Sequence, residues 1–152
     1  MRINEVLQKS QISDEFRGAV EDWQEMWQTT EAAKIILASP EARPFMQPPS
    51  LTKIYRAVRK LYKPSKDAIV AYAANWQGAA NFAESFNVTG KWFMIEKKFN
   101  PNDFLLDFTS MIQHYGLVGP RDENEYELWM KPTPYYTTGS EEEVYMRFAT
   151  YG

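Results

Sequence analysis

The chain changes from helical to strand-like patterns at Thr52-Lys53-Ile54-Tyr55-Arg56-Ala57-Val58. β-Branched and aromatic side chains make this stretch typical of a β-strand. Just before it, Pro44, Pro48 and Pro49 interrupt a helix-rich segment. The segment is too small to bury a core of its own, so we expect one domain over residues 1–152. In that domain, residues 1–50 form a helical lead-in to an α+β core at residues 51–152.

The lead-in contains three helical patterns and one further helix start. Residues 3–9 predict a short helix, and Ala32–Leu37 another. A longer helix begins at about Ser13, a candidate N-cap. Apolar residues follow it at spacings of four, three and four, which is one helical stripe: Phe16, Val20, Trp23 and Trp27. Ser39-Pro40-Glu41 looks like a cap followed by proline at the first helical position.

The core alternates between strand and helix patterns. Strands are predicted at 91–99, 125–130 and 144–148, and an amphipathic helix at 103–115 that ends at Gly116. Residues 67–86 follow helical spacing, but 68–73 equally fit a short buried strand. The pattern predicts an α+β fold, with N-terminal helices packed on a mostly antiparallel β-sheet.

Composition excludes several classes of protein. Lys and Arg number 17 against 20 Asp and Glu, a net charge of −3, so general nucleic-acid binding is not expected. The absence of cysteine and the single histidine exclude disulfide scaffolds and Cys- or His-clustered metal sites. We therefore expect no metal. Aromatic residues make up 15% of the chain, which fits either an aromatic core or a face that meets a ligand.

Targeting signals and the common catalytic motifs are also missing from the sequence. No stretch approaches 18 apolar residues, and the N-terminus lacks the apolar run of a signal peptide, so we expect a cytoplasmic protein without a membrane span. No glycine-rich phosphate loop and no zinc-protease or serine-hydrolase motif occurs.

Two features of the core could carry chemistry. Arg56 in an apolar strand needs a partner, which is either a structural group or a bound phosphate or carboxylate. Glu125 and Glu127 share one face of a strand. They form either a solvated strand edge or a carboxylate pair that stabilises a developing cation or acts as a base. If the glutamate strand has a different register from the one assigned here, Glu141 and Glu143 are the alternative carboxylate pair.

Taken in order, these features resemble the mono-ADP-ribosyltransferases of the arginine–serine–glutamate type, including small ones made by bacteriophages. The resemblance covers roughly residues 52–148. Ile54-Tyr55-Arg56-Ala57-Val58 resembles the family's arginine strand, and Gly78-Ala79-Ala80-Asn81-Phe82-Ala83 the helix after its serine motif. Glu125-Tyr126-Glu127-Leu128-Trp129-Met130 resembles the glutamate-x-glutamate strand. Where the family has Ser-x-Ser, this chain has Ala71-Tyr72-Ala73-Ala74-Asn75.

The resemblance implies a split β-sheet core and an NAD-dependent transferase that modifies a protein acceptor, as a phage or bacterial effector does in the host cytoplasm. It implies that Glu127 holds the nicotinamide ribose of the substrate NAD and favours the developing cation. Glu125 would orient or deprotonate the acceptor, which the family's pattern suggests is an arginine.

The resemblance also suggests residues that bind NAD. Arg56 would pair with the diphosphate, and Tyr55, Tyr72 or Phe82 would stack on nicotinamide or adenine. Tyr72 or Asn75 would replace the serine hydroxyls as hydrogen-bonding groups. Two non-enzymatic alternatives stay open on such a scaffold: a binding or inhibitor module, and a virion or assembly protein.

Overall fold

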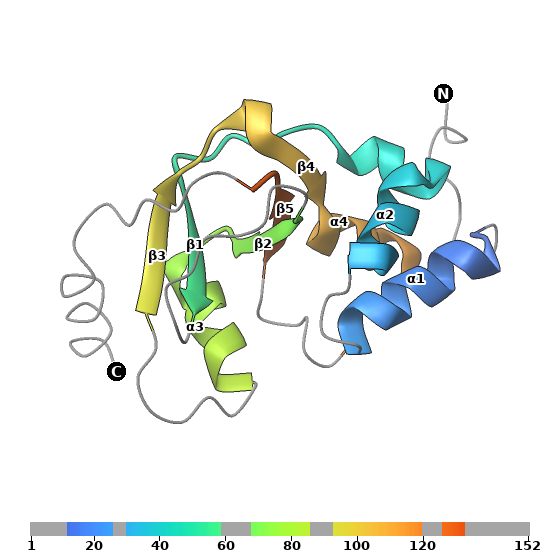
Figure 1. The fold of residues 1–152 in the computed structure, drawn as a ribbon, viewed down its shortest axis with the longest axis horizontal. Helices are drawn as coiled ribbons and strands as arrows, with labels where there is room; N and C mark the ends of the chain where they lie inside the picture. The colour runs from blue at the N-terminus through green and yellow to red at the C-terminus, as the bar shows by residue number, and fades with distance from the viewer. Residues whose placement is uncertain (1–11, 26–29, 59–67, 86–92, 120–125, 133–152) are drawn as a thin grey trace.

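A computed structural model of the chain describes residues 12–25, 30–58, 68–85, 93–119 and 126–132 (Figure 1). Its elements in chain order are α1 (Asp14–Glu25), α2 (Thr30–Ala38), the 3₁₀ helix η3 (Pro40–Phe45), β1 (Lys53–Val58), β2 (Val70–Ala73), α3 (Trp76–Ser85), β3 (Phe93–Lys98), the 3₁₀ helix η4 (Pro101–Asp103), β4 (Phe104–Asp107), α4 (Phe108–Tyr115) and β5 (Glu127–Met130). The helix predicted at residues 3–9, Trp27 and the strand predicted at 144–148 lie outside the described residues. The α+β class is confirmed.

The lead-in helices begin close to where capping chemistry places them. The Ser13 hydroxyl accepts a hydrogen bond of 3.1 Å from the Phe16 amide, so Ser13 caps α1 as predicted. Pro40 does begin a helical turn, but that turn is the 3₁₀ helix η3. The Ser39 hydroxyl does not cap it and instead donates to the Ile35 carbonyl, at 2.7 Å. Ser39 therefore ties down the last turn of α2.

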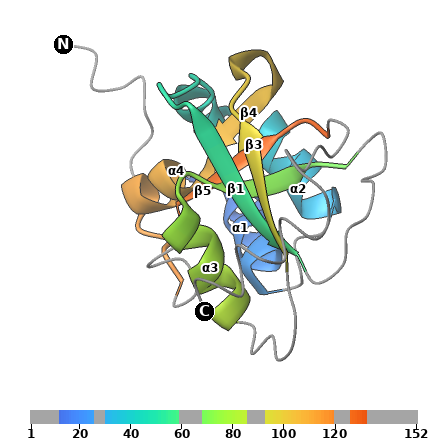
Figure 2. The ribbon, with the colours of Figure 1, turned by 90° about the vertical axis from the view of Figure 1, so that its left-hand side faces the viewer.

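The strands form one antiparallel sheet in the order β3-β1-β2-β5-β4. β1 and β3 share six registered pairs, but β1 and β2 share one, Tyr55↔Ala73. β2 leaves β1 at a steep angle, as Figures 1 and 2 show. The sheet is therefore divided between the β3-β1 and the β2-β5-β4 parts.

The ambiguous stretch 67–86 contains both a strand and a helix. Residues 70–73 form β2, and the Asn75 side chain then accepts a hydrogen bond of 2.7 Å from the Gly78 amide, which caps α3. A Cβ at Gly78 would lie 3.3 Å from the Ala73 Cβ and 3.5 Å from the Tyr126 amide nitrogen. Glycine at this position lets the first turn of α3 lie against the strands.

The helix predicted at 103–115 is wrong over its first part, because Phe104–Asp107 forms strand β4 beside β5. Phe104 and Leu106 are buried against β5, and this pairing outweighs the local helical spacing. The Asp107 carboxylate then caps α4 by accepting from the Ser110 amide at 3.0 Å. Gly116 ends α4 in the left-handed region, with φ of 68°, as predicted. β5 likewise begins at Glu127, two residues after the predicted start.

Helices cover one face of the sheet, called here the helix-covered face. α3 packs there on a cluster that contains Ala57, Ala73 and Met94. α1, α2 and α4 pack on a second cluster, which contains Ala71 and Trp129 from the sheet. The opposite face holds a third buried cluster, which includes Ile54, Tyr72 and Leu128. The lead-in and the core thus share the second cluster.

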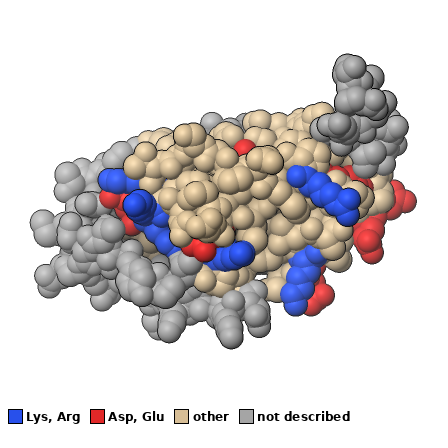
Figure 3. Space-filling model, turned by 90° about the horizontal axis from the view of Figure 1, so that it is seen from above, with Lys and Arg blue, Asp and Glu red and all other residues tan. Residues whose placement is uncertain are grey.

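Within the described ranges, the helices are all too short or too polar to cross a bilayer. On the face of the molecule seen in Figure 3, most charged side chains lie toward the two ends, and a few lie near the middle of a mainly neutral surface. The basic side chains visible there do not form a continuous stripe.

Candidate functional site

The strand order brings the three predicted motif segments side by side. β1 carries Tyr55 and Arg56, β2 occupies the place of the missing serine motif, and β5 carries Glu127. Tyr55 pairs with Ala73, and Ala73 pairs with Glu127. Directly paired residues point to the same face, so these three side chains form one row across the helix-covered face.

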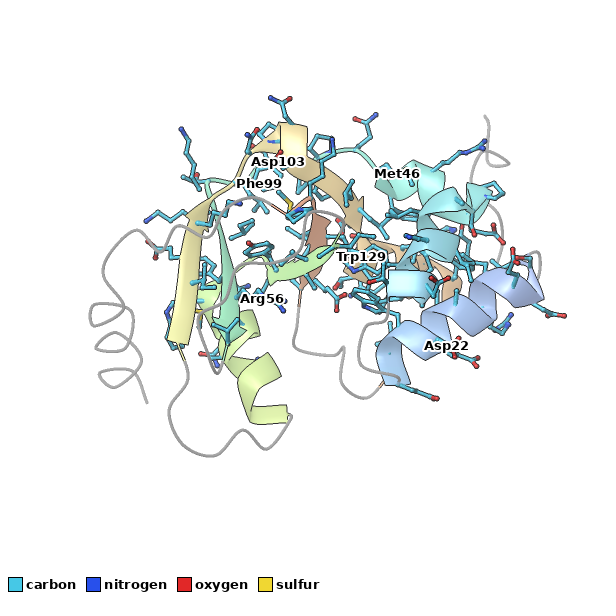
Figure 4. The ribbon with its side chains drawn as sticks, viewed as in Figure 1. Asp22, Met46, Arg56, Phe99, Asp103 and Trp129 are labelled. Carbon is cyan, nitrogen blue, oxygen red and sulfur yellow. The ribbon has the colours of Figure 1, made fainter. Side chains whose placement is uncertain are left out.

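Glu127 is buried and held by aromatic donors. It is 9% exposed, and its Oε2 accepts a hydrogen bond of 2.7 Å from the indole of Trp23 and another of 2.7 Å from that of Trp129. The Glu127 amide donates to the Thr109 hydroxyl at 2.7 Å. Both the backbone and the carboxylate of this residue are therefore fixed in orientation. Figure 4 labels Trp129, which lies on the α1 side of the molecule.

Arg56 lies out of the row, since neighbouring residues of a strand point to opposite faces. Its Nη1 donates a hydrogen bond of 2.6 Å to the Ala71 carbonyl. The Ala74 amide bonds to the Tyr126 carbonyl on the β5 side, so Ala71, three residues earlier, directs its carbonyl toward β1. The guanidinium therefore bridges β1 and β2 where their ladder ends (Figure 4).

The other predicted NAD-binding residues are divided between the two faces. Tyr55 is half-buried and packs against the α3 cluster on the side of Glu127. Tyr72 is buried on the opposite face, where the Lys97 ammonium lies 5.8 Å from its ring centroid. The Asn75 side chain serves as the cap of α3.

The side chains of four predicted residues lie outside the described part of the chain. Phe82 belongs to α3, but its side chain lies outside the described part, as do Glu125 and the alternative carboxylate pair Glu141 and Glu143. The structure therefore brings together Tyr55 and Glu127 of the predicted set, with Asn75 beyond the end of β2.

Sequence reasoning missed the residues that hold Glu127. Trp23 was assigned to the apolar stripe of α1, and its indole N–H gave no signal of a polar partner 104 residues away. Trp129 stands two residues after Glu127, and this spacing does place both side chains on one face of a strand. This two-residue spacing was the sequence signal that could have identified Trp129 as a partner of Glu127.

A small polar cluster lies beside the start of β5. The Ser110 hydroxyl donates to the Asp107 carboxylate at 2.8 Å, and the Tyr126 hydroxyl donates to the same carboxylate at 3.2 Å. Tyr126 is 39% exposed, so this cluster meets solvent one residue away from buried Glu127.

One open hollow lies in the helical lead-in, away from the predicted site residues. This hollow of about 560 Å³ lies between the start of α1 and the end of α2, lined by Ser13, Lys34 and Glu41 among others, and none of the predicted site residues lines it. Among the described residues, no three His, Asp or Glu side chains gather as metal ligands would.

Comparison of the chain with protein families, with curated proteins and with solved structures finds no match.

Proposed function

We propose that this protein is an NAD-dependent mono-ADP-ribosyltransferase that modifies a protein acceptor. The observation that supports the proposal is the row Tyr55–Ala73–Glu127, which joins the arginine, serine and glutamate segments of the resemblance on adjacent strands. The division of the sheet beside this row fits the expected split core of that fold.

The chemistry requires a fixed negative charge near the anomeric carbon of the nicotinamide ribose. When the bond from that carbon to nicotinamide breaks, nicotinamide leaves with the electron pair and positive charge develops on the sugar. A preorganised carboxylate stabilises such charge without reorganising in the transition state. Glu127 is held in this way, and Tyr55 in the same row offers a ring for stacking.

The geometry changes the expected role of Arg56. Its guanidinium reaches the Ala71 carbonyl at the edge of β2 instead of joining the row. We assign Arg56 a primary role in holding the two parts of the sheet together. A contact with the diphosphate of NAD is a secondary role.

The direct test measures NAD binding and NAD consumption. A ligand that binds only the native state at about 100 times its Kd stabilises it by about 2.7 kcal/mol, which raises the midpoint of thermal unfolding. Glu127→Gln keeps an oxygen that can accept from both indoles, so the fold is retained. We expect transfer of labelled ADP-ribose to fall by about 10²-fold or more, while NAD binding stays. Glu21→Gln, at an exposed position of α1, is the matched control.

One observation favours a second candidate, a binding module with a non-catalytic site. The segment in place of Ser-x-Ser contains no hydroxyl on the helix-covered face beside Glu127, because Ala71 and Ala73 occupy it. If the protein is such a binding module, we expect NAD to leave the midpoint of thermal unfolding unchanged. We also expect a stable complex with another protein to be recovered.

A further inference from the structure

The lead-in helix α1 contributes directly to the site in the sheet. Its Trp23 is 3% exposed and donates the indole N–H to Glu127 Oε2 at 2.7 Å. Trp129, which is fully buried, donates to the same oxygen at 2.7 Å. One carboxylate oxygen thus receives two indole donors, one from the lead-in and one from β5.

Packing prevents the two indoles from turning away. The ring centroids of Trp23 and Trp129 lie 4.3 Å apart, and Phe108 stacks on Trp129 at 5.2 Å with an interplanar angle of 12°. Trp23 also touches Phe108, with centroids 6.3 Å apart. Close-packed aromatic rings reorient only if their neighbours move. The direction of both N–H bonds is therefore set by the core.

The use of tryptophan at position 23 is not explained by packing alone. Phenylalanine would satisfy the apolar stripe of α1 and would leave no polar group to match. The indole instead places a donor opposite an acidic residue that sits in a buried strand. A buried carboxylate needs such donors, and it is most strongly oriented when they are rigid.

We infer that Trp23 is a positioning residue for Glu127. Its N–H holds the carboxylate in the orientation from which Glu127 stabilises the charge that develops when NAD is cleaved. The inference rests on the proposed function, and it makes α1 a part of the reaction site.

The test compares Trp23→Phe with the native chain in steady-state NAD turnover. Phenylalanine retains most of the ring contacts with Trp129 and Phe108 but lacks the donor. We expect kcat to fall about tenfold or more while KM for NAD stays within about twofold, because orientation acts in the transition state. The acid limb of the pH–rate profile is expected to move to higher pH, since a lost donor disfavours the ionised carboxylate.

The matched control is Gln24→Met on the same helix. Gln24 also ties α1 to the rest of the molecule, because its Nε2 donates to the Leu117 carbonyl at 2.8 Å. It does not take part in the Glu127 hydrogen bonds described above. Its loss is expected to lower stability without moving kcat or the pH–rate profile.

The outcomes separate the inference from the function on which it rests. A native chain that neither binds nor consumes NAD overturns the proposed function and the inference with it. A native chain that turns over NAD, with Trp23→Phe equal to it in kcat and pH profile, overturns the inference alone. If circular dichroism shows that Trp23→Phe is unfolded, replacement of Trp23 by 3-benzothienylalanine, which keeps the bicyclic ring but has sulfur in place of the N–H, decides by the same kinetic criteria.

Discussion

At the scale of single residues, the Glu127 carboxylate satisfies two buried indole donors, so its replacement has a cost that does not depend on catalysis. Glu127→Leu leaves both N–H groups without an acceptor. A buried donor left without a partner costs about 1–3 kcal/mol, so for the two indoles together we expect the free energy of unfolding to fall by about 2–6 kcal/mol. Glu127→Gln should cost about 1 kcal/mol or less. Urea denaturation measures both, and equal stabilities of the two variants would contradict this account.

Lys97 gives the stability a pH dependence. Its Nζ is buried and has no hydrogen-bond partner within the described residues, and burial lowers the pKa of this amine, an effect that Asp103 partly opposes. Below the ordinary lysine pKa of about 10.4, the unfolded chain therefore binds a proton more tightly than the native protein does. The native state should gain stability as pH rises from the lowered pKa toward that ordinary value.

Lys97→Met removes this contribution. We expect the variant to be more stable than the native chain near neutral pH, with the difference shrinking as pH approaches 10. Urea midpoints measured between pH 7 and 10 test this expectation, and Lys98→Met, an exposed neighbour, controls for the loss of one positive charge. A difference that stays constant over the range would contradict the role assigned to burial.

At the scale of elements, one registered pair and the hydrogen bond from Arg56 join the described residues of β1 and β2, in addition to the apolar clusters that both strands share. Arg56→Met removes the donor to the Ala71 carbonyl, and we expect a loss of about 1–3 kcal/mol in the free energy of unfolding. Hydrogen exchange should accelerate in β2 more than in β3, which keeps six pairs with β1. If stability and exchange are unchanged but NAD binding is lost, Arg56 is a ligand-binding residue.

The same junction shows how far sequence reasoning reached. β1 and the helical stripe of α1 were predictable because strand propensity and spacing are local properties. β4 was not, because Phe104 and Leu106 take strand geometry from pairing with β5, about 25 residues later in the chain. Residues 67–86 remained ambiguous for a related reason: β2 is four residues long, and its pairing partners are distant in sequence.

The candidate site was predictable only in part. The sequence indicated Glu127 and the strand that carries Tyr55, since both rest on short local patterns. It did not indicate Trp23, because an indole donor on an apolar helical stripe looks the same whether its N–H meets a carboxylate or solvent. The sequence predicted that Arg56 needs a partner. In the structure its Nη1 donates to the Ala71 carbonyl, which is accessible to it because β1 and β2 separate there.

At the scale of the whole molecule, the helices of the lead-in belong to the same hydrophobic cluster as the sheet. α1 and α2 share one buried cluster with Ala71, Leu106 and Trp129 of the sheet, and Trp23 adds a polar tie to Glu127. A chain that starts at Leu51 would expose this apolar surface and leave Glu127 without one donor. We expect residues 51–152 alone to lack a cooperative urea transition, whereas the full chain unfolds in a single one. A truncated chain with a sharp transition and the native near-ultraviolet circular dichroism would show instead that the helices are an accessory to a self-sufficient sheet domain.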